Sequence, residues 1–478
     1  MKRTLVLAIS VLAACVQLSA YDFMEDGICY VKNADGKSVN VTFEVNSNSV
    51  PRYSSLSGEV IIPEYVSHEG NSYEVTAIGW HSFEKCVNIT SISLPNTLKW
   101  IGFSAFWNCS GLTSIVIPNS VTEIGEQAFY SCSNLSEIQF GESIEGVGAS
   151  AFAGTPWLNN QPDGLLYIGK NAYKYIGEMP PATNIQIKEG TKGLSGDCFA
   201  ECDGLQSLTI PKTVTFIGYH VVHGCNNLTD MVVDPENQVF DSRDNCNSII
   251  ITDTNALVIG CAGSTIPSTV TTIDYEAFLD CAGLTSITIP DNVTKIDQSA
   301  FQGCVGLTSV DFGNGITKIE GSAFRNCSGL TSVTIPASVT EIGNSTFSGC
   351  SNLKQLEIGC SVTRLGGFAF FDCISLEMVI NNALTPQKAD SYLFGNLDCK
   401  KCHLKVWHEV IDKYKEADVW KDFDIQDLGG VEGVEADAKA KTVEGYYNLQ
   451  GVRFDNPERG QVSIIRYTDG SAAKVFVR

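Results

Sequence analysis

A cysteine that recurs every 23 residues is the feature that most constrains this fold. Ten of the eighteen cysteines share one phase, and a phenylalanine lies three residues before each of them, except where Val222 replaces it. Phe152 keeps the phase where Thr155 replaces the cysteine, which makes eleven repeats. The in-phase residues are Cys86, Cys109, Cys132, Cys202, Cys225, Cys281, Cys304, Cys327, Cys350 and Cys373. A fixed period of this kind predicts one stack of repeats instead of several globular domains.

Each repeat contains one segment with the pattern of a short strand. In Leu-Thr-Ser-Ile-Thr-Ile-Pro, residues 284–290, β-branched and apolar residues alternate with polar ones before a terminating proline. The segment 299–304 is too short for more than a helical turn. Because a unit with one strand cannot bury its apolar face alone, neighbouring units must stack strand on strand. The sequence therefore predicts a solenoid of stacked parallel β-strands with short helical turns, mostly β, capped at both ends.

Interruptions of the 23-residue period predict the boundaries of the domains and insertions. Alternating aromatic and apolar residues in the two interruptions are typical of paired strands. Residues 408–423 place apolar side chains largely on one helical face, which suits a helix that closes the last coil. The predicted parts are an N-terminal β cap (21–70), the solenoid (71–398, with insertions 156–190 and 235–265), a last strand and capping helix (399–428), a polar linker (429–445) and a small C-terminal β module (446–478).

The first twenty residues have the pattern of a secretory signal peptide. Lys2 and Arg3 precede an apolar run, and Ser19 and Ala20 form a small-residue exit, so we expect cleavage after Ala20. The alternative is a lipoprotein lipidated at Cys15, because Leu-Ala-Ala-Cys fits that processing pattern. No later segment approaches the roughly 18 apolar residues of a membrane helix, so we expect no transmembrane segment. The predicted location is extracellular or on the outer cell surface.

The acidic balance of the chain bears on its partners. The formal net charge is −22, which argues against nucleic acid because phosphates would be repelled. The same charge opposes self-association of a repetitive chain, and we expect a monomer.

The repeats resemble the BspA-type leucine-rich repeat, whose unit reads roughly I-G-x-x-A-F-x-x-C-x-x-L-T-S-I-x-I-P. Ile124-Gly125, Ala128-Phe129 and Cys132 match it, and the match recurs over residues 75–381. The resemblance implies a secreted or surface-exposed bacterial protein that binds a host extracellular matrix or plasma protein, or a glycan. The segment 446–478 looks like the sorting domains of type IX secretion, but Gln461-Val462-Ser463 departs from that pattern. Sorting and structural capping both remain open for this module.

The in-phase thiols are interpreted as core groups. They repeat at the same depth as phenylalanine and leucine, where cysteine behaves as a small hydrophobe. Cys198 and Cys202 resemble a redox pair, but alignment to the repeat puts Cys198 at the alanine position. Cys246 and Cys261 bracket a predicted strand pair in the second insertion. In an exported protein, these two are the better candidates for a disulfide.

Two further motifs suggest cofactor or metal chemistry, and each has a structural alternative. The sequence CKKCH, residues 399–403, matches the c-type haem attachment pattern, but it also fits the start of the last strand. His220 and His223 precede Cys225 at metal-like spacing, yet they fall at variable positions of the repeat. The sequence contains no glycine-rich phosphate loop and no G-x-S-x-G. We therefore predict no catalytic residue, cofactor or metal ligand.

Small polar residues recur between the inward apolar positions of the predicted strands. Alternation puts them on the exposed side of the sheet, where they form a broad hydrogen-bonding surface. This candidate interaction face comprises Ser91, Ser93, Ser114, Ser207, Thr209, Ser286, Thr288, Ser309, Asp311, Ser332 and Thr334. The predicted function is adhesin-like binding, without catalysis, through this face and the insertions. The alternatives are a carbohydrate-active enzyme on a solenoid, which needs two carboxylates in one cleft, and a ligand-free spacer.

Overall fold

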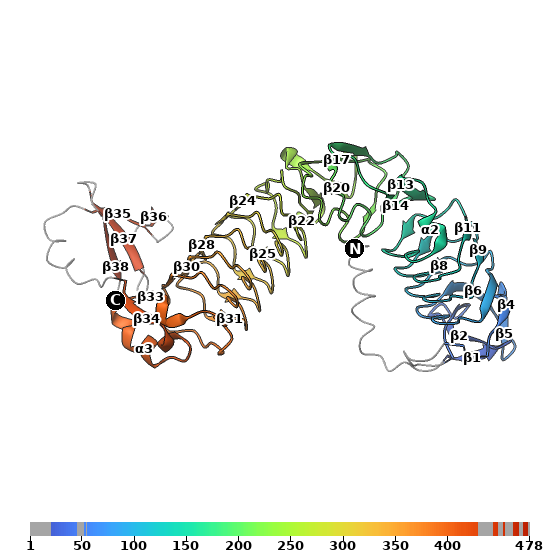
Figure 1. Cartoon of the computed structure of the whole chain (residues 1–478), viewed down its shortest axis with the longest axis horizontal. Helices are drawn as coiled ribbons and strands as arrows, with labels where there is room; N and C mark the ends of the chain where they lie inside the picture. Colours follow the sequence, from blue (N-terminus) through green and yellow to red (C-terminus); the bar gives the residue numbers. More distant parts are fainter. Residues whose placement is uncertain are drawn as a thin grey trace. The chain divides into compact units, whose positions relative to one another are not determined.

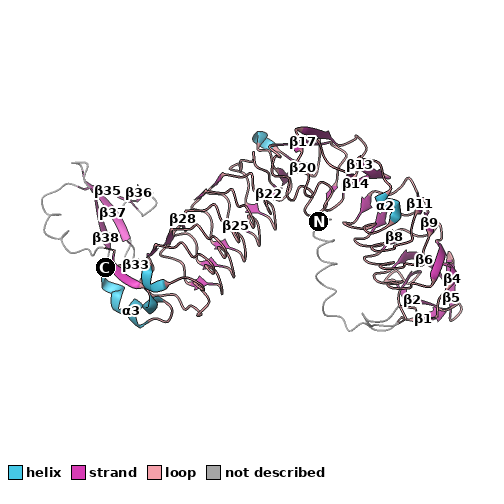
Figure 2. Cartoon of the chain, in the orientation of Figure 1, coloured by secondary structure: helices cyan, strands magenta, loops and turns pink. Residues whose placement is uncertain are grey.

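The computed structural model describes residues 21–44, 52–53, 55–428, 443–447, 453–454, 462–467 and 472–476. Both predicted processing sites of the signal peptide, and most of the predicted linker, lie outside the described residues. The chain divides into two compact units (Figure 1). The first comprises Met1–Cys225 and Val233–Asp241, and the second comprises Asn226–Val232 and Ser242–Arg478. Each unit contains stacked coils, where a coil is one repeat, and strands and loops dominate both (Figure 2).

A regular coil contributes two strands, not the single strand expected from the sequence. The longer strands pair in parallel to form what we call the strand ladder, and two-residue strands pair in parallel to form a second ladder. In the second unit, the strand ladder contains β24 (Ser286–Ile289), β26 (Ser309–Phe312), β28 (Ser332–Thr334), β30 (Gln355–Ile358), β32 (Met378–Asn381), β33 (His403–Val406) and β34 (Asp424–Asp427). Its second ladder contains β23 (Thr272–Ile273), β25 (Lys295–Ile296), β27 (Lys318–Ile319), β29 (Glu341–Ile342) and β31 (Arg364–Leu365).

The first unit has the same two ladders, preceded by an antiparallel sheet. That sheet contains β1 (Phe23–Glu25), β2 (Ile28–Lys32) and β3 (Ser38–Val41), and it joins β5 (Tyr65–His68) and β6 (Asn71–Ile78). The strand ladder contains β4 (Gly58–Ile61), β7 (Ile89–Ser93), β9 (Ser114–Ile117), β11 (Glu137–Phe140), β15 (Thr183–Gln186) and β17 (Leu205–Ile210). The second ladder contains β8 (Trp100–Ile101), β10 (Glu123–Ile124), β12 (Gly146–Val147), β16 (Gly193–Leu194) and β18 (Phe216–Ile217).

Each insertion contains an antiparallel strand pair. The first insertion forms α2 (Pro156–Asn159), β13 (Gly164–Ile168) and β14 (Asn171–Ile176), and the second forms η1 (Arg243–Asn245), β21 (Ile249–Ile251) and β22 (Ala256–Ile259). β19 (Asp230–Val233) and β20 (Phe240–Asp241) precede the second pair. The described parts of the C-terminal module are the antiparallel strands β35 (Val443–Tyr447), β36 (Arg453–Phe454), β37 (Val462–Tyr467) and β38 (Ala472–Phe476).

The segment expected to form a helical turn is instead a run of non-helical turns. Two residues in a regular coil have positive φ, such as Ser322 at 58° and Asn326 at 60°. An L-residue in this left-handed region costs roughly 1–2 kcal/mol, and glycine, asparagine and aspartate tolerate the region best. These residue types recur at the second of the two positions, so the residues chosen there match the turn geometry.

Stacked phenylalanine rings form the centre of each unit. In the second unit, the ring centroids from Phe278 through Phe301, Phe324 and Phe347 lie 4.8, 5.0 and 5.3 Å apart, with planes within 12° of parallel. All four side chains are buried. Burial of a phenylalanine contributes about 1.5–3 kcal/mol, so the stability of the stack is distributed coil by coil.

Other aromatic rings close the ends of these stacks. Tyr53 lies 5.1 Å from Phe83 at the start of the first unit, and Trp420 and Phe423 meet Phe394 edge-on at the end of the second. The capping helix predicted over 408–423 is broken into η3 (His408–Val410), α3 (Ile411–Glu416) and η4 (Trp420–Asp422). Val419, at φ 70°, interrupts it before the ring of Trp420 turns into the core.

The first insertion replaces part of a regular coil. In a regular coil, the phenylalanine N–H donates to a backbone carbonyl of the next coil, as Phe129 does to Ala151 over 2.7 Å. At Phe152 the same N–H donates to the hydroxyl oxygen of Tyr173, 3.0 Å away. The Tyr173 ring also meets Phe152 edge-on at 5.7 Å. A side chain of the insertion therefore takes over one backbone contact of the missing repeat.

Candidate functional site

The outward side of the strand ladder carries a regular array of polar side chains. Inward positions such as Ile287 and Val333 are buried, while the side chains between them face outward. The parallel register sets Ser286 beside Ser309 and Thr288 beside Asp311 on the next strand. We call this outward side of the longer strands the strand face.

The structure places all the predicted face residues at outward positions of these strands. Those on β24, β26 and β28 are exposed: Ser286, Thr288, Ser309, Asp311, Ser332 and Thr334. Ser93 and Ser114 are also exposed, whereas Ser91, Ser207 and Thr209 are half-buried. Ser207 donates a hydrogen bond to Asn184 on the neighbouring strand over 2.5 Å. The second unit therefore presents the more open part of the strand face.

The strand face continues past the predicted residues and changes in chemistry. The register carries it from Gln355 to Met378, His403 and Asp424. His403 Nδ1 lies 2.6 Å from Asp424 Oδ2, and Gln426 Nε2 donates to the same oxygen over 2.9 Å. The hydrogen bond from His403 lowers the pKa of Asp424. These residues fall outside the predicted face because β33 follows β32 after 25 residues instead of 23.

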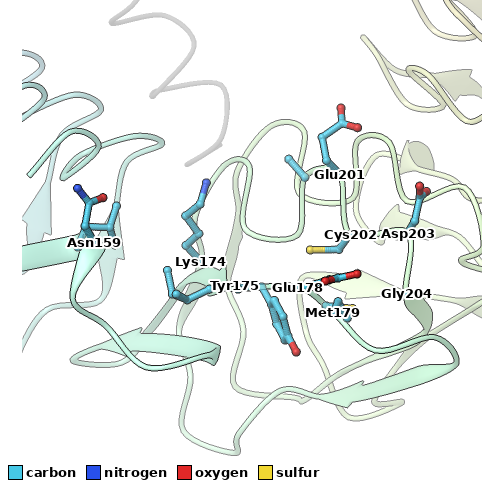
Figure 3. Close-up of a pocket in the computed structure, with 13 residues that line it drawn as sticks. Asn159, Lys174, Tyr175, Glu178, Met179, Glu201, Cys202, Asp203 and Gly204 are labelled. Carbon is cyan, nitrogen blue, oxygen red and sulfur yellow. The ribbon is translucent and has the colours of Figure 1, made fainter.

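A pocket of about 590 Å³ lies at the first insertion (Figure 3). It is lined by the end of α2, by residues 174–179 at the end of β14, and by residues 200–204 of the following coil. Its apolar wall includes Leu158, Ile176 and Met179. This volume falls in the range of small-molecule sites, and no sequence pattern pointed to it, because it forms where the repeat is interrupted.

Charged side chains of both signs line this pocket. Lys174 contributes one ammonium group, and Glu178, Glu201 and Asp203 contribute three carboxylates (Figure 3). Glu201 Oε1 lies 3.5 Å from Nδ1 of His223, and the Glu201 side chain is 76% exposed. Cys202 also lines the pocket, but desolvation raises the pKa of its thiol to about 11. The thiol is therefore protonated near neutral pH and a poor nucleophile.

Nine of the ten in-phase thiols are buried in the core, where many also donate hydrogen bonds, whereas Cys202 is half-buried and lines the pocket. In the second unit, the Sγ atoms of Cys304, Cys327, Cys350 and Cys373 lie 3.0–3.3 Å from the phenylalanine carbonyl oxygen of the preceding coil. All four are buried and are free thiols in the structure. They therefore combine the packing of a small hydrophobe with a bond between coils.

The structure contains no disulfide between the two cysteines of the second insertion, Cys246 and Cys261. Cys246 Sγ lies 3.6 Å from the carbonyl oxygen of Ser248, and Cys261 Sγ lies 3.2 Å from that of Asn247. Both side chains are buried. Their pairing in the exported protein stays a prediction, which non-reducing peptide mapping can test.

The two cofactor-like motifs take the positions expected of the repeat. In CKKCH, Cys399 and Lys401 bound η2 (Cys399–Lys401), Cys402 is buried in the core, and His403 faces outward on β33. The thiol and the imidazole thus lie on opposite sides of the strand. His220 and His223 pair with Asp197 and Glu201, at 3.6 and 3.5 Å. Among the described residues, no group of three or more His, Cys, Asp or Glu is placed to hold a metal ion.

The comparison with known families decides what these repeats are. The model of the "BspA type Leucine rich repeat region" matches in six copies, over residues 70–179, 166–256 and 261–403, which is more than half of the chain. The chain belongs to the BspA-type leucine-rich repeat family. No curated protein matches it. Within the described part of this BspA-type chain, no helix is both long and apolar enough to cross a membrane.

Several solved structures are similar to this BspA-type chain. A leucine-rich cell surface protein from Faecalibacterium prausnitzii is 25% identical, covers 77% of this chain and 96% of its own, and has a TM-score of 0.46. The pneumococcal vaccine antigen PcpA is 18% identical, with coverage of 85% and 98% and a TM-score of 0.46. A leucine-rich repeat protein from Eubacterium ventriosum is 20% identical, with coverage of 80% and 90% and a TM-score of 0.46.

The thiols of the BspA-type repeat should make the fold sensitive to alkaline pH. Burial raises the pKa of Cys350 from 9.0 to about 12. The stabilisation from this raised pKa is complete below pH 9, where the thiol is protonated in both states, and is lost as pH rises from 9 towards 12. Above pH 9, each further pH unit should cost about 1.4 kcal/mol for this thiol alone. Urea unfolding at increasing pH measures the loss, and Cys350→Ala should show a shallower dependence. Equal slopes would contradict the assignment.

Proposed function

We propose that this protein is a secreted or surface-displayed, adhesin-like interaction protein without enzymatic activity. It binds a host protein or a glycan through the strand face and the insertions. The observation that carries the proposal is the register of exposed short polar side chains on consecutive strands, such as Ser286 beside Ser309 and Thr288 beside Asp311. Exposed hydroxyl and carboxylate groups in a regular array offer many donors and acceptors to one extended partner.

The partner must contact several coils, because one coil exposes too small an area for a stable interface. A stable protein interface buries on the order of 1,200 Å² or more, counted over both partners. One exposed pair of side chains per coil cannot supply that area, so binding must extend over several coils. No single serine or threonine of the strand face is therefore expected to dominate the affinity.

The location of the protein is part of this proposal. Export through the N-terminal signal puts the strand face outside the cell, either free after cleavage at Ala20 or tethered through a lipid on Cys15. Mass spectrometry of the mature N-terminus distinguishes the two forms.

The proposal is tested with paired variants in neighbouring coils. Thr288→Arg with Thr334→Arg adds two bulky charges to the strand face, where both threonines are exposed. The control, Thr317→Arg with Thr340→Arg, adds the same charges to exposed threonines beside the second ladder. Wild type and both variants are compared on a glycan array and against immobilised host matrix and plasma proteins. We expect the face variant to lose at least tenfold in affinity, about 1.4 kcal/mol, while the control retains binding.

The outcomes of this test separate the alternatives. Equal loss in both variants would mean that charge, not the strand face, controls binding. Absence of binding to the whole panel at micromolar concentration would favour a ligand-free spacer.

A carbohydrate-active enzyme is the second candidate, and the pocket is the observation that favours it. Three carboxylates line the pocket, and glycoside hydrolysis needs two carboxyl groups about 5–10 Å apart in one cleft. Release of reducing sugar from any glycan on the panel, abolished by Glu178→Gln, would move the assignment to this candidate. Unchanged glycans would leave the binding role in place.

A further inference from the structure

Two aromatic side chains on the turn that follows β31 meet a third on the turn that follows β32, at the C-terminal end of the repeats. Phe368 and Tyr392 are 42% and 56% exposed. Their rings are stacked, with centroids 5.1 Å apart and planes 17° from parallel, and Phe371 meets Phe368 edge-on at 5.5 Å. We call Phe368, Phe371 and Tyr392 the aromatic triad. Exposed rings in contact with one another form an apolar patch, not scattered single side chains.

Phe368 departs from the chemistry of its position in the repeat. The residue immediately before the alanine-phenylalanine pair of the repeat is polar or charged in the other coils. The residues in this column are His81, Ser104, Gln127, Ser150, Asp197, His220, Glu276, Ser299, Ser322, Ser345 and Phe368. The position has positive φ, 55° at Ser345 and 60° at Phe368. A bulky aromatic residue is poorly suited to this conformation.

Folding alone does not account for the triad. The ring of Phe368 is neither buried in the core nor on a relaxed backbone, so it contributes little to stability there. The ring of Phe371 lies over Gly395, where a Cβ would come within 2.5 Å of it. This glycine allows the ring to approach the backbone of the next coil closely. An unfavourable backbone, an exposed stack and a glycine that accommodates it together suggest a binding surface.

Carboxylates border the triad. Asp390 Oδ1 accepts the backbone N–H of Tyr392 over 2.9 Å, and Asp390 Oδ2 lies over Gly367, next to Phe368 in the chain. Asp372 Oδ1 accepts a hydrogen bond from Asn396 Nδ2 over 2.6 Å, beside Phe371 in the chain. The whole protein carries a net charge of −22. The surroundings of the rings therefore favour a cationic partner group over an anionic one.

We propose that the aromatic triad and Asp390 bind an arginine side chain of a basic protein partner. A guanidinium group can stack on an aromatic face while it pairs with a carboxylate, and the triad and Asp390 together offer the two groups. Tyr392 is the platform, because one face of its ring rests on Phe368 and more than half of the side chain is exposed. Tyrosine and arginine are also the residues that most often dominate protein interfaces. This deepens the proposed function by naming the partner's chemistry, at a surface separate from the strand face.

The test uses variants that leave the charge of the protein unchanged. Phe368→Ser restores the serine found at this column in other coils, and Tyr392→Ala removes the platform. Binding of a labelled oligo-arginine peptide to the full chain is measured at physiological salt, beside an oligo-lysine peptide of equal length. We expect each variant to weaken arginine-peptide binding at least about fivefold, and Tyr392→Phe to retain it. Lysine-peptide binding should change less, because an ammonium group does not stack as a plane.

Stability separates a binding role from a structural one. Phe368→Ser should keep or raise the thermal midpoint, because the ring is largely exposed and serine occupies the same position of positive φ in other coils, as at Ser345. A fall of several degrees would show that the ring is structural and would overturn the proposal. Equal peptide binding by wild type, Phe368→Ser and Tyr392→Ala would overturn it too, as would a neutral glycan that binds through Tyr392 in place of the peptide. Because the strand-face variants leave the triad intact, loss of binding there does not affect this result.

Discussion

Replacing Phe324 with alanine should lower the free energy of unfolding of the second unit by about 3–5 kcal/mol. The ring is fully buried and lies between those of Phe301 and Phe347, at 5.0 and 5.3 Å, with Phe312 edge-on at 5.6 Å. Truncation removes apolar burial and leaves a cavity that the stacked coils cannot close, because their backbones are held by hydrogen bonds between coils. Urea unfolding followed by the fluorescence of Trp420, in the same unit, measures the change.

The neighbouring residue provides the control for this substitution. Arg325 is exposed, so Arg325→Ala should change the stability by no more than about 0.5 kcal/mol. If the two substitutions cost the same, the phenylalanine stack would not be the core of the unit.

Removing two complete coils should abolish partner binding while leaving a folded protein. Deletion of residues 297–342, two periods of 23, joins Ile296 of β25 to Gly343 and brings Phe278 next to Phe347 in the stack. In a solenoid each coil contacts mainly its neighbours, so the shortened chain retains a continuous core. The deletion also removes β26 and β28, with Ser309, Asp311, Ser332 and Thr334.

Circular dichroism and a binding titration against the partner found in the panel measure the two effects of this deletion. Thr334→Ala alone should change the affinity less than about threefold, because the contact area is spread over coils. Loss of binding from that single substitution would contradict a distributed interface. A two-coil deletion that binds as tightly as wild type would exclude these coils from the site.

The interior of the repeat could be read from the sequence because burial imposes strict residue types. The prediction of a BspA-type solenoid of parallel strands is confirmed by the structure and the family match. Phe324 and Cys327, for example, are both fully buried at the depth that the period implies. Outward positions such as Thr334 followed from the same alternation.

The second ladder could not be predicted from alternation, since a strand of two residues, such as Lys295–Ile296, has no period to detect. The residue types in the turns indicate their conformation, but the expectation of a helical turn was wrong. Asparagine, aspartate and glycine recur at positions such as Asn326 and Gly349 because the backbone there has positive φ. A helical turn would have imposed no such preference.

The pocket, the end of the strand face and the aromatic triad were the hardest to predict, because they lie where the repeat is irregular. The pocket depends on the contact between the first insertion and residues 200–204, which are far apart in the sequence pattern. The position of His403 on the strand face could not be predicted from the period, because its strand is displaced by two residues. In the aromatic triad, the departure of Phe368 from a polar column was visible in the sequence, but its stacking on Tyr392 was not.

The central claim is that the inward columns of the repeat build the fold and the outward strand face carries function. The most direct measurement is the affinity of wild type, Thr288→Arg with Thr334→Arg, and Thr317→Arg with Thr340→Arg for one partner, alongside their thermal midpoints. The account predicts equal midpoints, with affinity lost only in the strand-face variant. A strand-face variant that is as stable as wild type and binds as tightly would contradict it.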